Sequence, residues 1–455
     1  MCRVVARIIV IGAGVAGLAA AARMASGANE VTLVERGVAA GGAVSWAGPH
    51  TLTLPATLRD LFVKTGGRKA GSAGALENVV DLRPVDPVRR FAFPDGTRLD
   101  LPNTSRGATK DAFDAAFGAG SGEAWLRVLD HGNRAWGAIR PTLVEVPDAG
   151  RADLWRLLRS TSARRALAPR RTLRQVAADA GVRDPRMVRV LDEYAIGAGA
   201  LPEQAPAILA IRPYIEHAFG AWRVVGGLTE LVTAMYERCL ARKVTFRFET
   251  EATAVAEGAV TLANGERLAA DVIVAALDAQ VLARLTGPTG GKRPNVAYSP
   301  SAFSVRLTLD DAAAKIEMPY EVVLFGQPGE RTIRVHSAPE QPREWVATVD
   351  ADSRSEVDAT ALAADVARRL GVSGDGLTVA DVLRPADLER LTGTPGGSLH
   401  GPAVDSLSSA LLRSPTVQPI RGLLHIGASA RPGPGVAFAA LGAWNAAEVL
   451  KPTRV

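Results

Sequence analysis

Cysteine is scarce in this chain of 455 residues, which contains only Cys2 and Cys239. Two cysteines cannot build a disulfide framework, so the sequence excludes a small disulfide-stabilised secreted protein and favours a reducing cytoplasm. The six histidines are scattered, and none has a histidine or cysteine neighbour at metal-ligand spacing. We therefore predict no metal site.

Long apolar runs are also missing. The stretch from Ile8 to Ala22 carries no charge, but it is too short for a membrane-spanning helix and contains three glycines. Arg3 and Arg7 precede it, which leaves a secretory signal peptide as an alternative interpretation. With 47% hydrophobic and 22% charged residues, the composition is that of an ordinary soluble protein with two or three domains.

The most informative pattern lies near the start of the chain, where an apolar strand runs into Gly-Ala-Gly-Val-Ala-Gly at 12–17 and an alanine-rich helix. Gly12 permits the tight turn, Gly14 lets the backbone approach a pyrophosphate, and Gly17 lets helix and strand pack closely. The helix N-terminus offers free N–H groups and a positive dipole end to the phosphates. A second strand ends at Glu35, placed to bind the adenosine ribose. The pattern predicts a dinucleotide site.

A second glycine pair, Gly41-Gly42, follows Glu35 by six residues. This pair is usual in flavoproteins of the glutathione-reductase-like group, so we predict FAD, with NAD(P) as the alternative. Gly197-Ala198-Gly199 is followed by Pro202 where a nucleotide-binding helix needs glycine, so a separate NAD(P)H domain is not expected. Reoxidation of the flavin is therefore expected to fall to O2, a quinone or another acceptor.

Positive charge is concentrated in residues 151–189, which hold eleven arginines against three aspartates, within a net charge of +6. Trp155, Leu157 and Leu158 lie among these arginines. One interpretation is a segment that rests on an anionic membrane, and the other is a solvated helix face. No nucleic-acid-binding motif accompanies the charge. We expect a cytoplasmic protein, with possible peripheral contact at the inner face of the plasma membrane and no nucleic-acid partner.

The order of patterns along the chain predicts an α/β fold: a Rossmann-like, glutathione-reductase-like FAD-binding domain with an inserted α+β substrate domain. Residues 105–210 read as a helical lid or membrane-facing segment. The boundaries are 1–75, 222–290 and 395–455 for the FAD-binding domain, and 76–221 and 291–394 for the substrate domain.

Local patterns add four elements. Residues 89–102 predict a hairpin with a type I′ turn at Asp95-Gly96. Residues 244–255 read as one strand, and residues 300–350 alternate like an antiparallel sheet that could line a substrate cavity. Residues 421–450 read as a strand, a Gly/Pro loop and a helix.

Five separated segments together resemble the bacterial phytoene (carotenoid) desaturase-like flavoproteins, within the flavin amine-oxidase superfamily. The resemblance implies an FAD-dependent oxidoreductase that transfers a hydride from a substrate C–H to flavin N5 and forms C=C in an isoprenoid or polyene, a small and apolar substrate. The segments are GPHTLTLPATLRDLF (48–62), residues 172–207, YIEHAFGAWRVVGGLTEL (214–231), RPADLERLTGTPGGSLHG (384–401) and residues 422–450.

The resemblance, together with the fingerprint, assigns the cofactor-binding residues. Ala252 would touch the adenine side, Gly427, Ala428, Gly435 and Val436 would follow the ribityl chain and flavin ring, and Pro49 and Trp222 would lie near the isoalloxazine. Ala43 departs from the family, which has a basic residue there. The full set is Gly12, Ala13, Gly14, Ala16, Gly17, Glu35, Arg36, Gly41, Gly42, Ala43, Pro49, Ala252, Gly427, Ala428, Gly435 and Val436.

Three side chains are candidates for proton transfer: Glu216, His217 and Tyr214. A structural role at a domain interface is the alternative for each. Arg212 could neutralise a substrate carboxylate or pair with Glu216, and His50 could reach the flavin edge or serve as a cap or surface residue.

Two further functions stay open. One is a soluble flavin oxidoreductase of secondary metabolism that oxidises or reductively cyclises a smaller, more polar substrate. The other is a flavin-binding protein without enzymatic activity.

Overall fold

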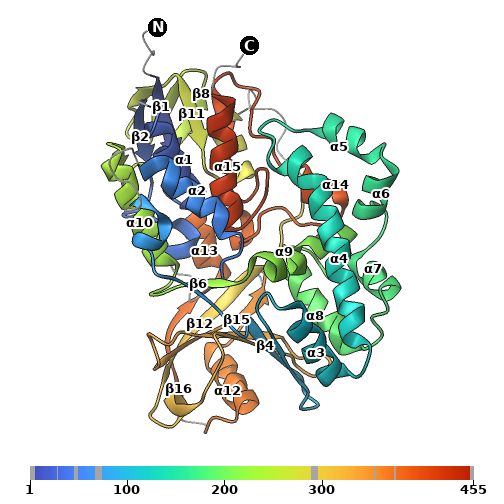
Figure 1. Cartoon of the computed structure of the whole chain (residues 1–455). Coiled ribbons are helices and arrows are strands. Elements are labelled where there is room, and N and C mark those ends of the chain that lie inside the picture. Colours follow the sequence, from blue (N-terminus) through green and yellow to red (C-terminus); the bar gives the residue numbers. More distant parts are fainter. Residues whose placement is uncertain are drawn as a thin grey trace.

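The computed structural model describes residues 6–27, 29–45, 50–66, 74–287, 296–352, 355–373 and 376–450 (Figure 1). Three residues of the sequence analysis, Cys2, Arg3 and Pro49, lie outside the described residues.

Five parallel strands form the first sheet, in the order β17-β11-β1-β2-β7. Ile9 in the central strand β1 lies beside Thr32 of β2 and Ile273 of β11. Valine, isoleucine and leucine predominate because both faces of a parallel sheet are buried. The strands are β1 (Arg7–Ile11), β2 (Glu30–Val34), β7 (Thr245–Arg247), β11 (Val272–Ala275) and β17 (Leu423–His425).

Alternate residues of β1 enter different cores because successive side chains of a strand point to opposite faces. Ile8 and Val10 pack with helices on one face, and Ile9 and Ile11 pack with a small sheet and α11 on the other. Helices α1 and α15 pack directly against each other (Figure 1). The helices around this sheet are α1 (Val15–Ala25), α2 (Pro55–Gly66), α10 (Leu228–Ala241), α11 (Ala279–Thr286) and α15 (Val436–Val449).

The small sheet is antiparallel, in the order β10-β9-β8, with β8 (Ala252–Ala256), β9 (Ala259–Leu262) and β10 (Arg267–Ala269). The prediction of one strand over 244–255 is therefore wrong, because β7 and β8 are separate strands of different sheets. Glu249, with a φ of 51°, turns the chain between them, and its N–H donates to the carbonyl of Gly37.

The third sheet has seven strands, in the order β16-β12-β15-β14-β13-β4-β5, and α12 (Ala359–Leu370) packs on one face (Figure 1). All its neighbours are antiparallel except β13 and β4. Its strands are β4 (Arg89–Ala92), β5 (Arg98–Leu101), β12 (Ser301–Leu309), β13 (Glu321–Leu324), β14 (Ile333–Ser337), β15 (Glu344–Ala351) and β16 (Leu377–Leu383).

The predicted hairpin is present as β4–β5, but its turn is not type I′. A type I′ turn needs a positive φ at both central residues, and here Gly96 has one (86°) whereas Asp95 does not. The Asp95 carboxylate instead accepts a hydrogen bond from the N–H of Thr97 (2.9 Å), and Gly96 N–H donates to the carbonyl of Phe93.

Residues 106–219 are mainly helical, as predicted for the lid, and they share one core with the β4–β5 end of the large sheet. Trp125 and Phe113, both buried, stack with ring centroids 4.4 Å apart at the centre of this core. The elements are α3 (Arg106–Phe117), α4 (Ser121–Ile139), a π-helical turn η4 (Arg140–Val144), α5 (Arg151–Leu158), α6 (Thr161–Leu167), α7 (Leu173–Asp179), α8 (Pro185–Ile196), η5 (Ala207–Ala210) and α9 (Ile211–Phe219).

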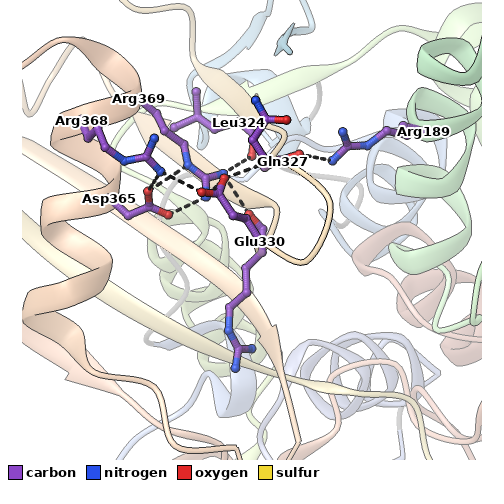
Figure 2. Close-up of polar contacts among 9 residues, drawn as sticks. Arg189, Leu324, Gln327, Glu330, Asp365, Arg368 and Arg369 are labelled. Atoms are coloured by element: carbon purple, nitrogen blue, oxygen red, sulfur yellow. Dashed lines mark hydrogen bonds and ion pairs between the residues drawn. The ribbon is translucent and has the colours of Figure 1, made fainter. Parts of the chain in front are cut away.

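The loop between β13 and β14 is held from two sides (Figure 2). Arg189 of α8 donates to the carbonyl of Gly326 (3.1 Å). From the other side, Arg369 of α12 donates to the carbonyl of Arg331 (2.9 Å) and pairs with Asp365 one turn earlier (2.6 Å). The loop therefore ties the helical segment to the large sheet.

Shorter elements complete the structure. Strands β3 and β6 pair antiparallel, with Arg83 beside Arg223. These elements are η1 (Gly42–Ser45), η3 (Leu76–Asn78), β3 (Leu82–Pro84), β6 (Trp222–Val224), η7 (Ala313–Lys315), α13 (Pro385–Thr392), η8 (Pro395–Gly397) and α14 (Leu407–Leu411). Within the described ranges, no helix combines the length and apolar character needed to cross a membrane.

Candidate functional site

The glycines of the first fingerprint lie where β1 passes into α1. A Cβ on Gly17 would lie 1.8 Å from the carbonyl oxygen of Gly12, so only glycine lets helix and turn pack this closely. A Cβ on Gly14 would meet no atom within 4 Å, so the space beside it is open. Gly14 is also the N-cap of α1, and no side chain caps this helix. Its first N–H groups therefore remain available to an anion.

The second glycine pair packs on this turn. Gly41 N–H donates to the carbonyl of Ala13 (3.0 Å), and a Cβ on Gly42 would lie 3.4 Å from the Cα of Gly14. Two glycine motifs that are 24 residues or more apart in the sequence thus form one surface. Ala43, where the family has a basic residue, is exposed.

Glu35 lies beside the same turn. Its Oε2 accepts a hydrogen bond from Ala13 N–H (2.6 Å), and its Oε1 accepts one from Gly37 N–H (2.8 Å). The carboxylate is therefore fixed at the end of β2. Ala252 starts β8, and two residues earlier Thr250 N–H donates to the carbonyl of Glu35 (2.9 Å), which brings the start of β8 to this side.

The remaining residues predicted near the nucleotide differ in their surroundings. Ala16 is buried within α1. Arg36 is tied elsewhere, because its Nη2 donates to the carbonyl of Arg390 at α13 (2.7 Å). Trp222 is half-buried, and its Nε1 donates to the carbonyl of Phe219 (3.0 Å).

The C-terminal loop, between β17 and α15, has the same features as the turn between β1 and α1. Gly427 and Gly435 have φ values of 112° and 119°, and Gly435 is the N-cap of α15, again without a side-chain cap. Ala428 is exposed, and Val436 is half-buried. Because β1 and β17 are parallel strands of one sheet, the helices that follow them begin at the same edge.

This arrangement fits FAD. The open space at Gly14 and the uncapped N-terminus of α1 suit the pyrophosphate, and the uncapped N-terminus of α15 suits the negative charge of a reduced flavin. The residues that would hold the cofactor are those of the two glycine motifs, Glu35 and the loop from Gly427 to Val436.

The three candidates for proton transfer lie on α9 but do not share one environment. Glu216 is buried, and His217 is half-buried and lines a small cavity with Glu216 and Tyr194. Tyr214 instead packs against α4, where its Cβ would lie 2.7 Å from a Cβ placed on Gly132. The structure thus brings together Glu216 and His217 and leaves Tyr214 apart.

Glu216 belongs to a buried polar cluster, which we call the Arg89 cluster. Arg89 Nη2 donates to Glu216 Oε2 (2.8 Å), and the hydroxyl of Tyr194 donates to Glu216 Oε1. Arg89 Nε also lies 3.5 Å from Glu321 Oε2, and Glu321 Oε2 lies 3.8 Å from His336 Nε2. The sequence analysis missed Arg89, Glu321 and His336; the signal was a charged residue in a strand that is otherwise apolar, as in Glu-Val-Val-Leu at 321–324.

Burial and charge determine the protonation of the Arg89 cluster. Burial raises the pKa of Glu216 above its ordinary value, against the attraction of Arg89. Burial alone would raise the pKa of Glu321 as well, but the electrostatic effects of Arg89 and His336 outweigh burial, and the pKa is lowered. Burial lowers the pKa of His336 to about 4, against the pull of Glu321. His336 is therefore neutral at physiological pH, and Glu321 is the counter-ion of Arg89.

The ring of His50 packs against the ring of His336. Their ring centroids are 5.1 Å apart, edge to face, and burial lowers the pKa of His50. His50 thus adds a neutral imidazole to the edge of the Arg89 cluster.

An apolar cavity of about 60 Å3 lies between the helical segment and the C-terminal loop. Pro432 and Pro434, from the loop that precedes α15, form part of its wall, and Arg212 and Arg413 are the charged residues among the lining. The lining residues are Trp136, Ile139, Val144, Ala198, Ile208, Leu209, Ile211, Arg212, Val404, Ala410, Leu411, Arg413, Pro432, Pro434 and Phe438.

Comparison with known proteins defines the class. A family model described as an FAD binding domain matches residues 7–59, and one described as flavin containing amine oxidoreductase matches residues 76–314, more than half of the chain. The fold and the site are those of an FAD-dependent oxidoreductase, and FAD is its cofactor. The chain belongs to the family of flavin-containing amine oxidoreductases.

Its relatives confirm the predicted resemblance. The 4,4'-diapolycopene oxygenase of Methylomonas sp is 29% identical over 60% of this chain and 56% of that protein, so the match spans just over half of its length. The hydroxyneurosporene desaturase of Rubrivivax gelatinosus is 27% identical over 98% of this chain and 93% of that protein. A solved structure of wild-type putrescine oxidase bound to putrescine is 14% identical, with 98% of both chains covered and a TM-score of 0.62, which confirms the predicted fold class.

Proposed function

We propose that the protein dehydrogenates an isoprenoid or polyene, forming a carbon–carbon double bond. The observation that carries this proposal is the apolar cavity, whose wall includes Pro432 and Pro434 of the loop assigned to the flavin. The names of its relatives, a hydroxyneurosporene desaturase and a diapolycopene oxygenase, support a substrate of this class.

The reaction removes two hydrogens from adjacent carbons. The bound flavin supplies N5 as the acceptor of the hydride, and the neighbouring carbon loses a proton. The apolar lining, including Trp136, Ile208 and Phe438, orients an apolar chain and excludes water. Glu216 and His217 are our candidates for receiving the proton, and Tyr214 is the third. Glu216 and His217 line the small cavity beside α9, which shares no lining residue with the apolar cavity. We propose O2 or a quinone as the acceptor that reoxidises the flavin.

We further propose a cytoplasmic protein that contacts an anionic membrane through α5 and α6. Trp155 on α5 is 72% exposed, and Arg156, Arg159, Arg164 and Arg165 around it are exposed as well. These helices lie at the outer corner of the molecule, away from the parallel sheet (Figure 1). The turn η4, whose Val144 lines the apolar cavity, contacts α5. An apolar substrate dissolved in the membrane would therefore have a short route to the cavity.

The test is conversion of a polyene by the FAD-loaded protein. Phytoene or hydroxyneurosporene in anionic liposomes, with a quinone as acceptor, should yield products lighter by two hydrogens for each new double bond. Protein without FAD is the control. Complete FAD loading without any dehydrogenated product, in liposomes where a known carotenoid desaturase turns over, would contradict the proposal.

A second candidate is a soluble oxidoreductase of secondary metabolism that acts on a smaller, more polar substrate. The observation that favours it is the presence of Arg212 and Arg413 in the cavity wall, because a hydrocarbon has no group that binds them. Turnover of a polar substrate, without turnover of polyenes, would identify this function.

A further inference from the structure

The apolar cavity has two positive charges in its wall. Arg212 is the second residue of α9, and Arg413 follows α14. Arg212 acts on Arg413, since it contributes to lowering the pKa of Arg413 after the larger effect of burial. The two cations therefore lie within electrostatic range of each other, in surroundings that are otherwise apolar.

Arg212 has no carboxylate partner among the described residues. Its Nη2 donates to the carbonyl of Gly197 (3.0 Å), a neutral acceptor. The nearest acid that acts on it is Glu216, one helical turn further along α9. Both oxygens of that carboxylate are taken, one by Arg89 and the other by Tyr194. Most of the N–H donors of Arg212 are therefore free to bind a ligand.

Arg413 is held only by neutral groups in the described part of the chain. It is 6% exposed, and it donates to the carbonyls of His400 (3.0 Å), Ala428 (3.0 Å) and Pro402 (3.1 Å). Burial lowers its pKa to about 10, so it is still cationic at physiological pH. These bonds position the guanidinium. Asp278 and Tyr298 act on it electrostatically, but no carboxylate of the described residues forms an ion pair with it.

A nearby histidine, His400, does not change the positive charge of the cavity wall. Burial lowers the pKa of His400 to about 4, and Arg212 lowers it further in the same direction. His400 is therefore neutral at physiological pH, and the cavity wall stays positive.

Arg413 is buried and Arg212 is half-buried. Withdrawing a cation from water without a paired carboxylate is costly, and the cost is relieved when an anion binds. A guanidinium presents N–H groups in a planar fork that matches the two oxygens of a carboxylate or phosphate. We propose that the substrate is an apolar chain that ends in an anionic oxygen group, a carboxylate or a phosphate, and that Arg212 and Arg413 bind this end. The inference rests on the proposed function, because it assigns the rest of the cavity to the chain that is desaturated.

Binding to the FAD-loaded protein tests the inference without turnover. The probes are retinoic acid, its methyl ester and geranylgeranyl phosphate, and the readout is quenching of tryptophan fluorescence, since Trp136 lines the cavity. We expect the acid to bind roughly tenfold to a hundredfold more tightly than the ester, as charged hydrogen bonds contribute. Preference for the phosphate over the acid would identify the anionic group as a phosphate, and the reverse preference as a carboxylate.

Arg212→Gln should remove most of the difference between acid and ester, and Arg212→Lys should retain part of it. Arg98→Gln, which removes an exposed arginine from β5, is the control for net charge. Equal binding of acid and ester by the wild type would overturn the inference. Loss of FAD from Arg212→Gln would do so too, because the arginine would then serve the cofactor. Conversion of neutral polyenes alone would leave the proposed function intact and refute the anionic end. Tight binding of the acid without any desaturation would support the anionic end and contradict the proposed function.

Discussion

Arg89 Nη2 donates a hydrogen bond to Glu216 Oε2 (2.8 Å), and this buried pair joins β4 of the large sheet to α9 of the helical segment. The two residues are 127 positions apart in the sequence. Arg89 also lies within 3.5 Å of Glu321, so one guanidinium serves two buried carboxylates. The pair therefore positions the helix that carries Arg212, Glu216 and His217.

Removal of Arg89 should destabilise the protein strongly. Arg89→Met removes the arginine that pairs with both Glu216 and Glu321, and breaking a buried pair in this way costs about 3–5 kcal/mol. Arg90→Met is the matched control, because Arg90 pairs with the exposed Asp100 and such surface pairs contribute about 0–1 kcal/mol. Urea unfolding of both variants measures the difference. Equal stabilities would contradict a structural role for the Arg89 cluster.

Two glycines of the fingerprint should respond differently to alanine. Gly14→Ala adds a methyl group where no atom lies within 4 Å, so the protein should fold normally and lose FAD. Gly17→Ala places a methyl group 1.8 Å from the carbonyl oxygen of Gly12, so it should destabilise the fold itself. Flavin absorbance and thermal unfolding separate the two effects. A Gly14→Ala protein with full FAD content would show that the pyrophosphate does not approach there.

Stability should fall in mild acid because of His336. Its pKa is about 4 in the folded protein, against about 6.5 when unfolded. Between pH 4 and pH 6.5 the unfolded chain binds a proton that the folded protein does not. The contribution of His336 to stability is therefore fully present above about pH 6.5 and is lost as the pH falls towards 4. His336→Phe should flatten the dependence of Tm on pH in this window. An unchanged slope in the variant would mean that His336 does not titrate in this way.

Contact with membranes should depend on α5. Trp155→Ala and Arg156→Gln should each reduce sedimentation with anionic liposomes, and each arginine near the surface contributes about 1 kcal/mol. Raising the salt concentration should weaken the binding of the wild type. Val63→Ala, at a residue of α2 that is 62% exposed, is the control for a lost apolar side chain. Sedimentation that is the same for all variants would refute this docking surface.

The FAD cofactor and the fold around the first glycine motif could be predicted from the sequence because their signals are local. The first glycine motif directly follows β1 and the second follows β2 after a short loop, and the parallel order of these strands brings Gly41 N–H to the carbonyl of Ala13. The Arg89 cluster was not accessible, since its members come from β4, α8, α9, β13 and β14 and meet only after folding. The type I′ turn and the strand over 244–255 were wrong for a related reason: a hairpin signal does not specify the φ of Asp95, and Glu249 adopts a positive φ that its residue type disfavours.

The most direct test of the account is anaerobic mixing of the FAD-loaded protein with a polyene, with flavin absorbance and product analysed together. We expect the oxidised flavin to be bleached, with one new double bond formed for each flavin reduced. Quenching of tryptophan fluorescence in the same sample would establish that the polyene is bound. A flavin that stays oxidised while the polyene is bound would contradict the proposed desaturation.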